Sequence, residues 1–491
     1  MRLEKLLEKL EYKVVQGNLD VEICDVIMDS RKIVEGCAFV AIVGANVDGH
    51  DFLGQAVEGK ALAVIVSKDV ALDLPKDMTV IRVEDTRYAA ALMAAAYFDY
   101  PAKKLFTIGI TGTKGKTTTT YMVKNVLDSC NIKTGLIGTI ETIIGDERTP
   151  SKNTTPEAYD INKAFCKMID AGCKAVVMEV SSQGLMLHRT AGILFDIGVF
   201  TNLEKDHIGP NEHTSMEHYM ECKGMLFKQC KCAVVNCDDE HLDKVLCGHT
   251  CALETYGLSK EADFRANDMQ FFHEAGKIGT RYEISGKVED TIELSMPGIF
   301  SVYNSLCAIA ITSHFDISRE TMKKALLSVN VKGRIEPVKV SDKFTVLIDY
   351  AHNAMSLESI LKTLREYEPK RLVCLFGCGG NRSKDRRYEM GEVSGKYADL
   401  TIITSDNPRF EEPQDIIDDI KIGIGRTGGE YVEIINRKDA IKYAIENGRE
   451  GDIIVLAGKG HEDYQEIKGV KYPMDERVLI AEVMKELCMQ I

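Results

Sequence analysis

The sequence lacks an apolar run long enough to cross a bilayer, and it lacks an excess of positive charge. Across 491 residues, Asp and Glu outnumber Lys and Arg and leave a formal net charge of −14. This balance argues against a nucleic-acid-binding surface, although local basic loops can still bind a small anionic substrate. Residues 1–10 alternate charges with leucines and contain no signal-peptide core. We therefore expect a cytoplasmic protein without membrane insertion.

The 15 cysteines are scattered and form no repeated Cys-x-x-Cys pairs. Cys230 and Cys232 stand too close together for an ordinary zinc knuckle. We therefore expect reduced thiols, as in a cytosolic protein. The hydrophobic content of 45% is ordinary for a globular chain, and the length of 491 residues suggests about three domains.

A segment rich in glycine and threonine, residues 109–119, joins an apolar run to a helical pattern. Strand, glycine-rich turn and helix form the context of a phosphate-binding loop, because loop N–H groups and a helix N-terminus favour an anion. Lys116 can reach terminal phosphates, and Thr117 can ligate Mg²⁺. The spacing from Gly109 to Lys116 differs from the ordinary Walker pattern by one residue, so the compact segment 112–118 describes the loop better. The predicted nucleotide-binding residues of this loop are Gly112, Thr113, Lys114, Gly115, Lys116, Thr117 and Thr118.

The pattern along the chain predicts three α/β domains: residues 1–103, 104–332 and 333–491. The first is a small domain with a helix over 3–10, strands near 38–43 and 61–66, and a closing helix. In the other two, apolar strands alternate with helical patterns, which predicts a central P-loop parallel-sheet domain and a C-terminal Rossmann-like, doubly wound domain. The predicted strands cover 107–111, 134–138, 175–179, 197–201, 232–236, 344–349, 371–376, 400–404, 431–435 and 452–457. Residues 264–297 read as a β-rich excursion.

Polar residues follow the predicted strands of the central domain, where the ligands of parallel sheets gather. Glu179 ends an apolar strand, and a buried charge there is costly unless it is paired or bound to a metal. His207 follows the next strand and is a candidate metal or phosphate contact, because a Mg²⁺–nucleotide site can recruit a carboxylate and occasionally an imidazole. Lys223 lies in a helical pattern, and its spacing alone favours a solvated lysine.

The start of the last domain carries Arg334, Asp349 and His352, and charged groups from another domain can complete a nucleotide site on closure. Two later loops offer complementary charges. The loop 406–409 ends in Arg409, which suits bidentate recognition of a carboxylate. Glu462 follows another strand and can hold an ammonium group. The two loops together suit an amino acid, although each is also compatible with a capped turn.

These motifs, in this order, resemble the Mur ligase family of peptidoglycan synthesis, and the resemblance covers nearly the whole chain. The matching segments are residues 29–31, 112–118, 153–156, 178–182, 201–202 with 206–207, Lys223, 333–334, 349–352, 377–382, 406–409 and 458–462. The resemblance implies a monomeric, cytoplasmic three-domain ligase that uses ATP and one or two Mg²⁺ ions. Its small-molecule substrates would be UDP-MurNAc-L-Ala-D-Glu and an amino acid, with meso-diaminopimelate joined to the D-Glu through an acyl phosphate.

Four sets of site residues follow from the resemblance. The catalytic and metal-binding set is Lys116, Thr117, Glu179, His207 and Lys223, with Lys223 carbamylated. The ATP site adds Asn304, Arg334, Asp349 and His352 to the loop. The UDP-substrate site is Ser30, Ala45, Asn46, Val47, Asn153, Thr154, Thr155, Ser181 and Arg189. The amino-acid site is Arg382, Asp406, Asn407, Pro408, Arg409, Gly458 and Glu462.

The chain departs from the family pattern at Lys114, Gln183, Asn353-Ala354 and Ser301, and the last change makes Asn304 the expected nucleotide contact. Alternatives are the same reaction with L-lysine or another diamino acid, and a divergent paralogue with another amide-ligase substrate. The first domain and segment 153–156 weigh against a folylpolyglutamate synthetase or cyanophycin-type ligase. The missing Asn-Lys-x-Asp motif weighs against a nucleotide-dependent switch. Retention of Lys116, Glu179, His207 and Lys223 together weighs against an inactive binding protein.

Overall fold

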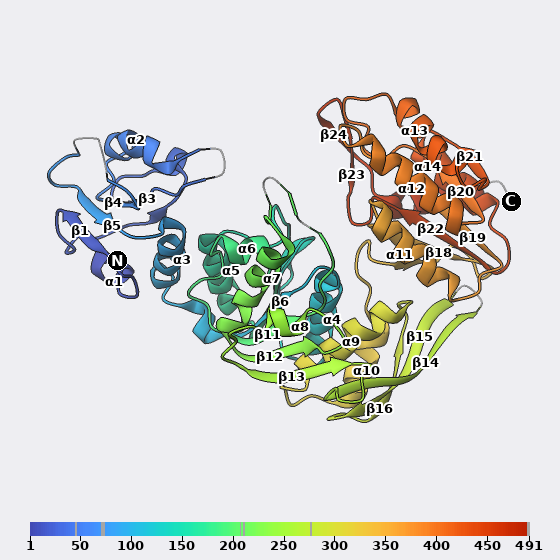
Figure 1. Cartoon of the computed structure of the whole chain (residues 1–491), viewed down its shortest axis with the longest axis horizontal. Helices are drawn as coiled ribbons and strands as arrows, with labels where there is room; N and C mark the ends of the chain where they lie inside the picture. The colour runs from blue at the N-terminus through green and yellow to red at the C-terminus, as the bar shows by residue number, and fades with distance from the viewer. Residues whose placement is uncertain (45–46, 70–73, 207, 210–211, 275–276, 489–491) are drawn as a thin grey trace. The chain divides into compact units, whose positions relative to one another are not determined.

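The computed structural model describes residues 1–44, 47–69, 74–206, 208–209, 212–274 and 277–488 of the chain. The chain divides into two compact units (Figure 1). Unit 1 consists of Met1–Asp263 and Cys307–Ser318, and unit 2 consists of Phe264–Leu306 and Arg319–Ile491. The domain boundaries 1–103, 104–332 and 333–491 stay a prediction.

Unit 1 begins with a five-stranded sheet in the order β1-β5-β4-β3-β2. Its strands are β1 (Lys13–Gln16), β2 (Val26–Ile27), β3 (Ala38–Val40), β4 (Ala63–Val66) and β5 (Thr79–Arg82). Helices α1 (Leu3–Leu6) and α3 (Thr86–Tyr97) pack on one face, and α2 (Leu53–Glu58) packs on the other. The helix predicted over 3–10 is shorter than expected, because the backbone leaves α geometry at Leu7 and continues as turns.

A second sheet of unit 1 has the order β13-β12-β11-β6-β10-β7-β8-β9. Its strands are β6 (Phe106–Thr111), β7 (Thr134–Ile137), β8 (Glu141–Ile144), β9 (Glu147–Pro150), β10 (Ala175–Glu179), β11 (Phe195–Phe200), β12 (Cys230–Asn236) and β13 (Ala252–Gly257). The strands from β13 to β7 are parallel, and β8 and β9 add an antiparallel hairpin. The five strands predicted here are confirmed, and their apolar runs are explained by burial on both faces.

Helices cover this second sheet. Buried side chains of α5 (Ala158–Asp170) and α6 (Ser182–Met186) share a core with Val176 and Met178 of β10. Helices α7 (Met216–Gly224) and α8 (Leu242–Val245) contribute Tyr219 and Val245 to the same core. Helix α4 (Lys116–Ser129) packs against β6, β7 and β10.

Unit 2 opens with the predicted β-rich excursion, which forms the antiparallel strands β14 (Phe264–Glu274), β15 (Lys277–Gly286) and β16 (Asp290–Leu294). Helix α9 (Ile299–Thr312) follows, and its residues from Cys307 onward belong to unit 1. Helix α10 (Arg319–Ser328) returns to unit 2 and packs on β16. The rest of unit 2 is built on a six-stranded sheet in the order β17-β18-β22-β19-β20-β21. Its strands are β17 (Glu336–Val338), β18 (Thr345–Asp349), β19 (Arg371–Phe376), β20 (Leu400–Ile403), β21 (Tyr431–Glu433) and β22 (Asp452–Ala457).

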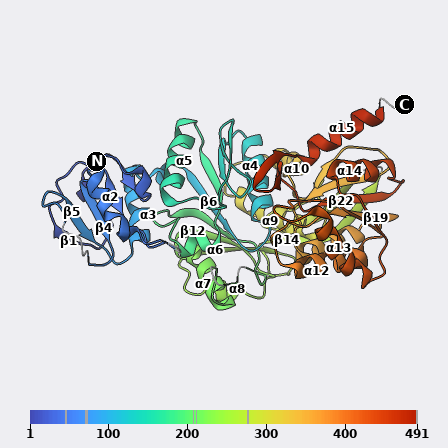
Figure 2. The ribbon, with the colours of Figure 1, turned by 90° about the horizontal axis from the view of Figure 1, so that it is seen from above.

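This C-terminal sheet is doubly wound, as the sequence predicts. Strands β18 to β22 run parallel, and only β17 is antiparallel among the described strands of this sheet. Helices α11 (Ala354–Arg365), α12 (Lys384–Tyr397) and α13 (Pro413–Gly425) cover one face, and α14 (Arg437–Glu446) and α15 (Glu476–Cys488) cover the other (Figure 2). A hairpin of β23 (Tyr464–Ile467) and β24 (Val470–Pro473) was not predicted.

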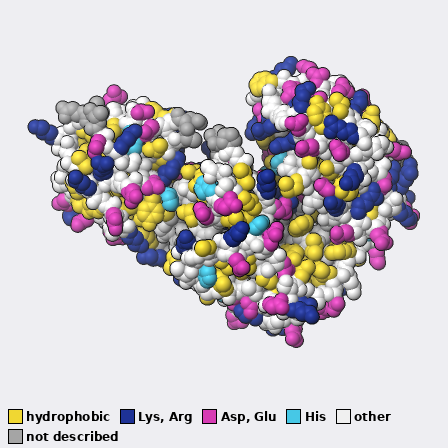
Figure 3. Space-filling model, viewed as in Figure 1, with side chains coloured by type: hydrophobic (Ala, Val, Ile, Leu, Met, Phe, Trp, Pro, Cys, Tyr) yellow, Lys and Arg dark blue, Asp and Glu magenta, His cyan; other side chains and the backbone are white. Residues whose placement is uncertain are grey.

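Among the described residues, every helix is too short or too polar to cross a membrane. On the face that Figure 3 shows, acidic and basic side chains are interspersed. The negative net charge of the chain is therefore not gathered into a single patch on that face.

Candidate functional site

The phosphate loop joins β6 to α4, and two of its glycines have backbone angles that only glycine adopts readily. Gly112 has φ 146° and Gly115 has φ 84°. A side chain at Gly112 would also overlap the hydroxyl oxygen of Thr201. The loop can therefore turn tightly at the end of β6 and present its N–H groups at the start of α4.

The end of β11 holds this loop in shape. The hydroxyl of Thr201 donates to the Lys114 carbonyl at 2.7 Å, and the Lys114 N–H donates to the Asn202 side-chain oxygen at 2.9 Å. The Thr113 N–H donates to the Asn202 carbonyl at 2.8 Å. These bonds come from the segment that directly follows β11, so the neighbouring strand helps to hold the shape of the loop.

Two lysines converge on one carbonyl oxygen of the loop. Lys116 Nζ donates to the Gly112 carbonyl at 2.8 Å and to the Thr113 carbonyl at 3.0 Å. Lys223 Nζ donates to the same Gly112 oxygen at 2.8 Å and lies 4.4 Å from the centre of the Tyr219 ring. Burial, and then the charge of Lys116, lower the pKa of Lys223 well below its usual value.

The interpretation of Lys223 as a solvated lysine is wrong, because its side chain is only 1% exposed. Helix α7 buries Tyr219, Cys222 and Lys223; the last two lie three and four positions after Tyr219 and so share its face of the helix. That face packs toward the phosphate loop, since the Tyr219 hydroxyl lies 3.1 Å from the hydroxyl of Thr113. The polar character of Lys223 hid this buried stripe in the sequence.

Glu179 forms the oxygen-rich part of the site. Its side chain is 1% exposed and accepts hydrogen bonds from the Thr117 hydroxyl at 3.0 Å and from the Thr139 N–H at 2.8 Å. The Thr139 hydroxyl donates to the second carboxylate oxygen at 2.9 Å. A carboxylate and a hydroxyl beside a helix N-terminus fit the oxygen preference of Mg²⁺. Thr139 is a site residue that the sequence did not reveal, and the predicted His207 lies outside the described residues.

Four of the residues predicted to bind the nucleotide-sugar peptide are connected to Glu179. The Thr155 hydroxyl donates to the Glu179 carbonyl at 3.0 Å, and the Ser181 N–H donates to that hydroxyl oxygen at 2.9 Å. Arg189 Nη1 donates to the Thr155 carbonyl at 2.9 Å. The Thr154 hydroxyl lies 3.1 Å from that of Thr139, while Asn153 is exposed.

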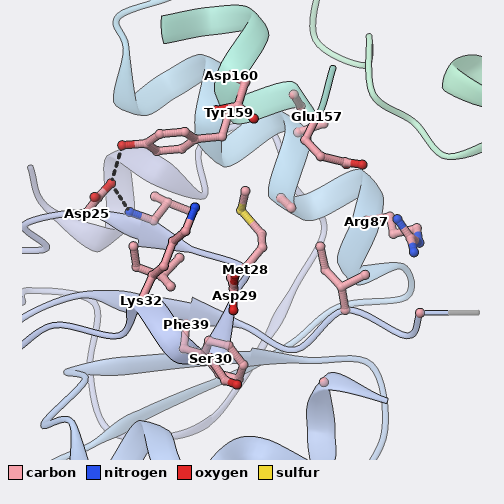
Figure 4. Close-up of a pocket in the computed structure, with 18 of the residues that line it drawn as sticks. Asp25, Met28, Asp29, Ser30, Lys32, Phe39, Arg87, Glu157, Tyr159 and Asp160 are labelled. Carbon is pink, nitrogen blue, oxygen red and sulfur yellow. Dashed lines mark hydrogen bonds between the residues drawn. The ribbon is translucent and has the colours of Figure 1, made fainter. Parts of the chain in front are cut away.

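A cavity of about 960 Å³ lies beside this group (Figure 4). Ser30 begins a short 3-10 helix, Val47 lies in a loop after β3, and Arg189 follows α6, so the structure brings these predicted contacts together. Ala45 and Asn46 lie outside the described residues. Asp25 Oδ1 accepts a bond from the Tyr159 hydroxyl at 2.8 Å across the cavity wall. Further polar or charged lining residues that the sequence did not indicate are Asp25, Lys32, Arg87, Glu157, Tyr159 and Asp160.

In unit 2, the residues predicted from the start of the last domain gather around one ring. The Arg334 guanidinium lies 4.9 Å from the centre of the Tyr350 ring, and the His352 ring centre is 4.6 Å from it. His461 packs against the same ring at 4.7 Å, and burial, then Arg334, lower its pKa to about 4. Asp349 accepts bonds from the Ile335 and Ala351 N–H groups, each at 2.9 Å. The predicted contact Asn304 lies on α9 and is half-buried.

The loops predicted to bind an amino acid meet in unit 2. Asn407 Nδ2 donates to Glu462 Oε2 at 3.0 Å. Lys459, which is fully buried, donates to Asn407 Oδ1 at 3.0 Å and to Glu462 Oε2 at 2.6 Å. Burial alone would raise the pKa of Glu462, but Lys459 lowers it to below the usual value. Lys459 is a further site residue that the sequence did not single out.

Arg409 points along these loops from a left-handed backbone position, with φ 53°. Its Nη1 donates to the Gly380 carbonyl at 2.8 Å, and its Nε donates to Glu466 Oε2 at 3.2 Å. The structure thus gathers most of the predicted set in one group of loops, and Arg382 is exposed on a neighbouring loop. The gathered residues are Asp406, Asn407, Pro408, Arg409, Gly458 and Glu462.

Models of three protein-family domains match the chain in order. They are the catalytic domain of the Mur ligase family over residues 22–98, the Mur ligase middle domain over 110–312, and the glutamate ligase domain of Mur ligases over 333–460. The chain belongs to the Mur ligase family. The family and the three-domain α/β class predicted from the sequence are thereby confirmed.

Several Mur ligases are similar over their full length. The UDP-N-acetylmuramoyl-L-alanyl-D-glutamate–2,6-diaminopimelate ligase of Caldanaerobacter subterraneus is 43% identical over 487 residues, 99% of each chain. Ligase 1 of the same name from Clostridium acetobutylicum is 42% identical, with 99% of this chain and 100% of that protein aligned. A solved structure of a ligase of this name has a TM-score of 0.74 at 28% identity and 99% coverage of both chains. The MurF ligase of Thermotoga maritima in complex with ADP shares the fold, with a TM-score of 0.59 at 19% identity and coverage of 95% and 98%.

Two departures from the Mur ligase pattern have structural partners. Lys114 Nζ forms an ion pair with Glu204 Oε2 at 2.7 Å, which ties the tip of the phosphate loop to the segment after β11. Asn353 caps α11, because its side-chain oxygen accepts a bond from the Ser356 N–H at 2.9 Å. Each replacement thus performs a local structural role.

Proposed function

We propose that this chain is a monomeric, cytoplasmic Mur ligase that joins meso-diaminopimelate to the D-Glu of UDP-MurNAc-L-Ala-D-Glu with consumption of ATP. The D-Glu γ-carboxylate attacks the γ-phosphorus, the bond to the bridging oxygen breaks, and an acyl phosphate and ADP form. The amino group of diaminopimelate then attacks the acyl carbon. It loses a proton, and inorganic phosphate leaves.

The phosphate loop supplies the ATP half of this proposal. Its N–H groups and the start of α4 would hold the phosphates, and Lys116 would exchange its bonds to the Gly112 and Thr113 carbonyls for bonds to phosphate oxygens. Thr117, Glu179 and a carbamylated Lys223 would hold Mg²⁺, which supplies positive charge that stabilises the transferred phosphoryl group. These oxygen donors fit the ligand preference of Mg²⁺, because Thr117 and Glu179 already offer side-chain oxygens 3.0 Å apart.

Carbamylation of Lys223 is part of the proposal. Its amine is buried beside Lys116, an arrangement that disfavours two ammonium groups. Bond formation between Nζ and CO₂, with loss of one proton, would replace that amine with a carboxylate. The product would add a further oxygen ligand next to the loop.

The cavity of unit 1 would hold the UDP-sugar, since polar side chains from two separate segments, residues 25–91 and 157–189, line it. Ser30, Val47 and Arg189 are its predicted contacts, and Thr155 and Ser181 connect it to Glu179. This continuity supports an orientation in which the peptide end of a bound substrate would lie toward the phosphate loop.

One observation carries the choice of amino acid: the guanidinium of Arg409 and the carboxylate of Glu462 lie on loops that meet in unit 2. Arg409 suits the distal carboxylate of diaminopimelate, and Glu462 suits its distal ammonium group. L-lysine, which lacks that carboxylate, is the competing substrate. The choice of L-lysine is favoured by the ion pair between Arg409 and Glu466, because Glu466 already neutralises the guanidinium that would otherwise bind a distal carboxylate.

A direct assay tests both assignments. The purified chain is incubated with UDP-MurNAc-L-Ala-D-Glu, ATP, Mg²⁺ and either meso-diaminopimelate or L-lysine, and ADP and the tripeptide product are measured. We expect ADP release and product with meso-diaminopimelate, and loss of both in Lys116→Ala. ADP at background in the complete mixture would contradict the ligase activity, and a preference for L-lysine would contradict the assignment of Arg409.

A further inference from the structure

A cysteine, a glutamate and a histidine meet in unit 1 away from the phosphate loop. The ligand atoms of Cys232, Glu254 and His314 all lie within 4.8 Å of one another. His314 Nε2 and Glu254 Oε2 are 2.8 Å apart. The three side chains come from β12, β13 and the segment that follows α9, so no motif in the sequence brings them together.

Strand register explains why two of the three share a face. Cys232 pairs with Ala252, and Val234 pairs with Glu254, in the parallel ladder of β12 and β13. Paired residues of a parallel ladder point to the same face, and so do residues two apart on one strand. Cys232 and Glu254 therefore point to one face as diagonal neighbours on adjacent strands.

The third side chain is held in place by the segment after α9. The Phe315 ring packs against the Phe106 ring of β6, with centres 4.6 Å apart. The His314 N–H donates to the Ile311 carbonyl at 3.3 Å. These contacts fix the backbone on both sides of the imidazole, so His314 meets Glu254 from a constrained position.

The donor chemistry suits a zinc ion. Thiolate, imidazole and carboxylate are the ligands that Zn²⁺ takes in proteins, and a site with three protein ligands leaves a fourth position for water. Bond lengths of about 2.0–2.3 Å set neighbouring donors about 3.3–3.6 Å apart, which small side-chain rotations reach from the observed spacing. The side chains of Glu254 and His314 are 20% and 27% exposed, so an ion can enter from solvent. One thiolate and one carboxylate also balance the charge of a divalent cation.

We propose that Cys232, Glu254 and His314 form a zinc-binding site on the sheet of unit 1. It is distinct from the proposed Mg²⁺ site, because Cys232 lies near the start of β12 and the phosphate loop follows the other end of the parallel sheet. The end of β12, Asn236, lies four positions after Cys232, a span of about 13 Å. A bound ion would link two strands to the segment after α9 and so stabilise unit 1.

Cobalt(II) is the probe, since it takes zinc sites and gives a charge-transfer band only when a thiolate is bound. The full chain is titrated with Co²⁺ in excess Mg²⁺ and without nucleotide. We expect a thiolate–cobalt band that saturates at one ion per chain. Cys232→Ser should abolish it, and His314→Gln should weaken Co²⁺ affinity by at least about tenfold. Cys247→Ser, which changes an exposed cysteine elsewhere in unit 1, should leave the band intact.

A second measurement guards against variants that fold poorly. Zn²⁺ should raise the melting temperature of the unsubstituted chain and of Cys247→Ser, with a rise that grows with the logarithm of Zn²⁺ concentration. Zn²⁺ should leave the melting temperature of Cys232→Ser unchanged. In the presence of a chelator, the unsubstituted chain and both variants should melt at the same temperature. The proposal is overturned if the unsubstituted chain gives no band, or if the band survives in Cys232→Ser. Neither readout depends on ligase turnover.

Discussion

The side-chain nitrogens of Lys116 and Lys223 lie 2.8 Å from the same carbonyl oxygen, that of Gly112. The two amines therefore share one acceptor beside the buried Lys223 side chain, where two ammonium groups would repel each other strongly. A carbamate on Lys223 would turn that repulsion into attraction and bring a new oxygen ligand to the loop.

The first prediction concerns this lysine. If Lys223 acts as a carbamate, removing CO₂ from the buffer should slow ADP formation, and bicarbonate should restore it. Lys223→Arg should lower kcat by about 100-fold or more, because it removes a group that stabilises the transferred charge. It should also abolish the response to bicarbonate. Lys228→Arg is the control, since Lys228 is exposed on the following turn; an equal bicarbonate response in Lys223→Arg would rule out the carbamate.

The second prediction concerns the turn of the phosphate loop. Gly112→Ala adds a methyl group that overlaps the Thr201 hydroxyl at a backbone angle that alanine rarely adopts. We expect it to weaken ATP binding strongly and to cost about 1–3 kcal/mol of stability. Gly54→Ala is the matched control, because it lies in α2 with open space at that position. Gly54→Ala should raise the free energy of unfolding, measured in urea, by about 0.5–1 kcal/mol. An equal loss of stability in both variants would contradict the role of Gly112.

The third prediction addresses substrate choice. Arg409→Met removes the guanidinium proposed to hold the distal carboxylate, so the KM for meso-diaminopimelate should rise by about 10–100-fold. The KM for ATP should stay the same, because Arg409 belongs to the loops of unit 2 that we propose to bind the amino acid and not to the phosphate loop. Steady-state kinetics with each substrate varied in turn measure both values. Arg426→Met, at an exposed arginine of unit 2, should change neither KM.

The fourth prediction concerns the buried ion pair behind Glu462. Lys459→Met leaves Asn407 Oδ1 and the Glu462 carboxylate without their shared donor, and breaking such a buried pair costs about 3–5 kcal/mol. Lys459→Met combined with Glu462→Gln should recover part of that stability, since the remaining side chain is neutral. A double-mutant cycle in urea unfolding measures the coupling. Strictly additive losses would show that the pair does not act as a unit.

The sequence was sufficient to predict those elements that have a clear local pattern of residues. Buried parallel strands are continuous apolar runs, so β6, β10 and β22 could be predicted nearly to the residue. The phosphate loop could also be predicted, because its glycines and Lys116 lie close together in the chain. Short polar hairpins such as β8–β9 and β23–β24 carry no such run and were missed.

Residues whose roles depend on partners far away in the chain could not be predicted from the sequence. Thr139 and Lys459 complete their sites through bonds to Glu179 and Glu462, and neither residue type signals this by itself. The cavity wall at Asp25 and Tyr159 joins segments 134 positions apart. Lys223 was misread for a related reason: an amphipathic pattern assigns charged residues to solvent, and only the packing of α7 reveals the buried one.

The last prediction concerns the pH dependence of unit 2 and rests on His461. Its pKa is lowered from 6.5 to about 4 by burial and by Arg334, with smaller contributions from Lys332 and Arg477, while Glu462 opposes them. Above pH 6.5 the imidazole is neutral in both the folded and the unfolded chain. As the pH falls from 6.5 to about 4, the unfolded chain binds a proton that the folded chain does not, so the free energy of unfolding falls over that window.

His461→Asn should remove this part of the pH dependence, because asparagine does not titrate. Amide exchange of peptides from residues 452–474, measured at pH values from 7.5 to 4.5 and corrected for intrinsic rates, reports the local free energy of opening. Protection in the unsubstituted chain should decline as the pH falls, and the decline should be shallower in His461→Asn. His249→Asn, in unit 1, should keep the original decline. An unchanged slope in His461→Asn would mean that other groups govern the acid sensitivity of these loops.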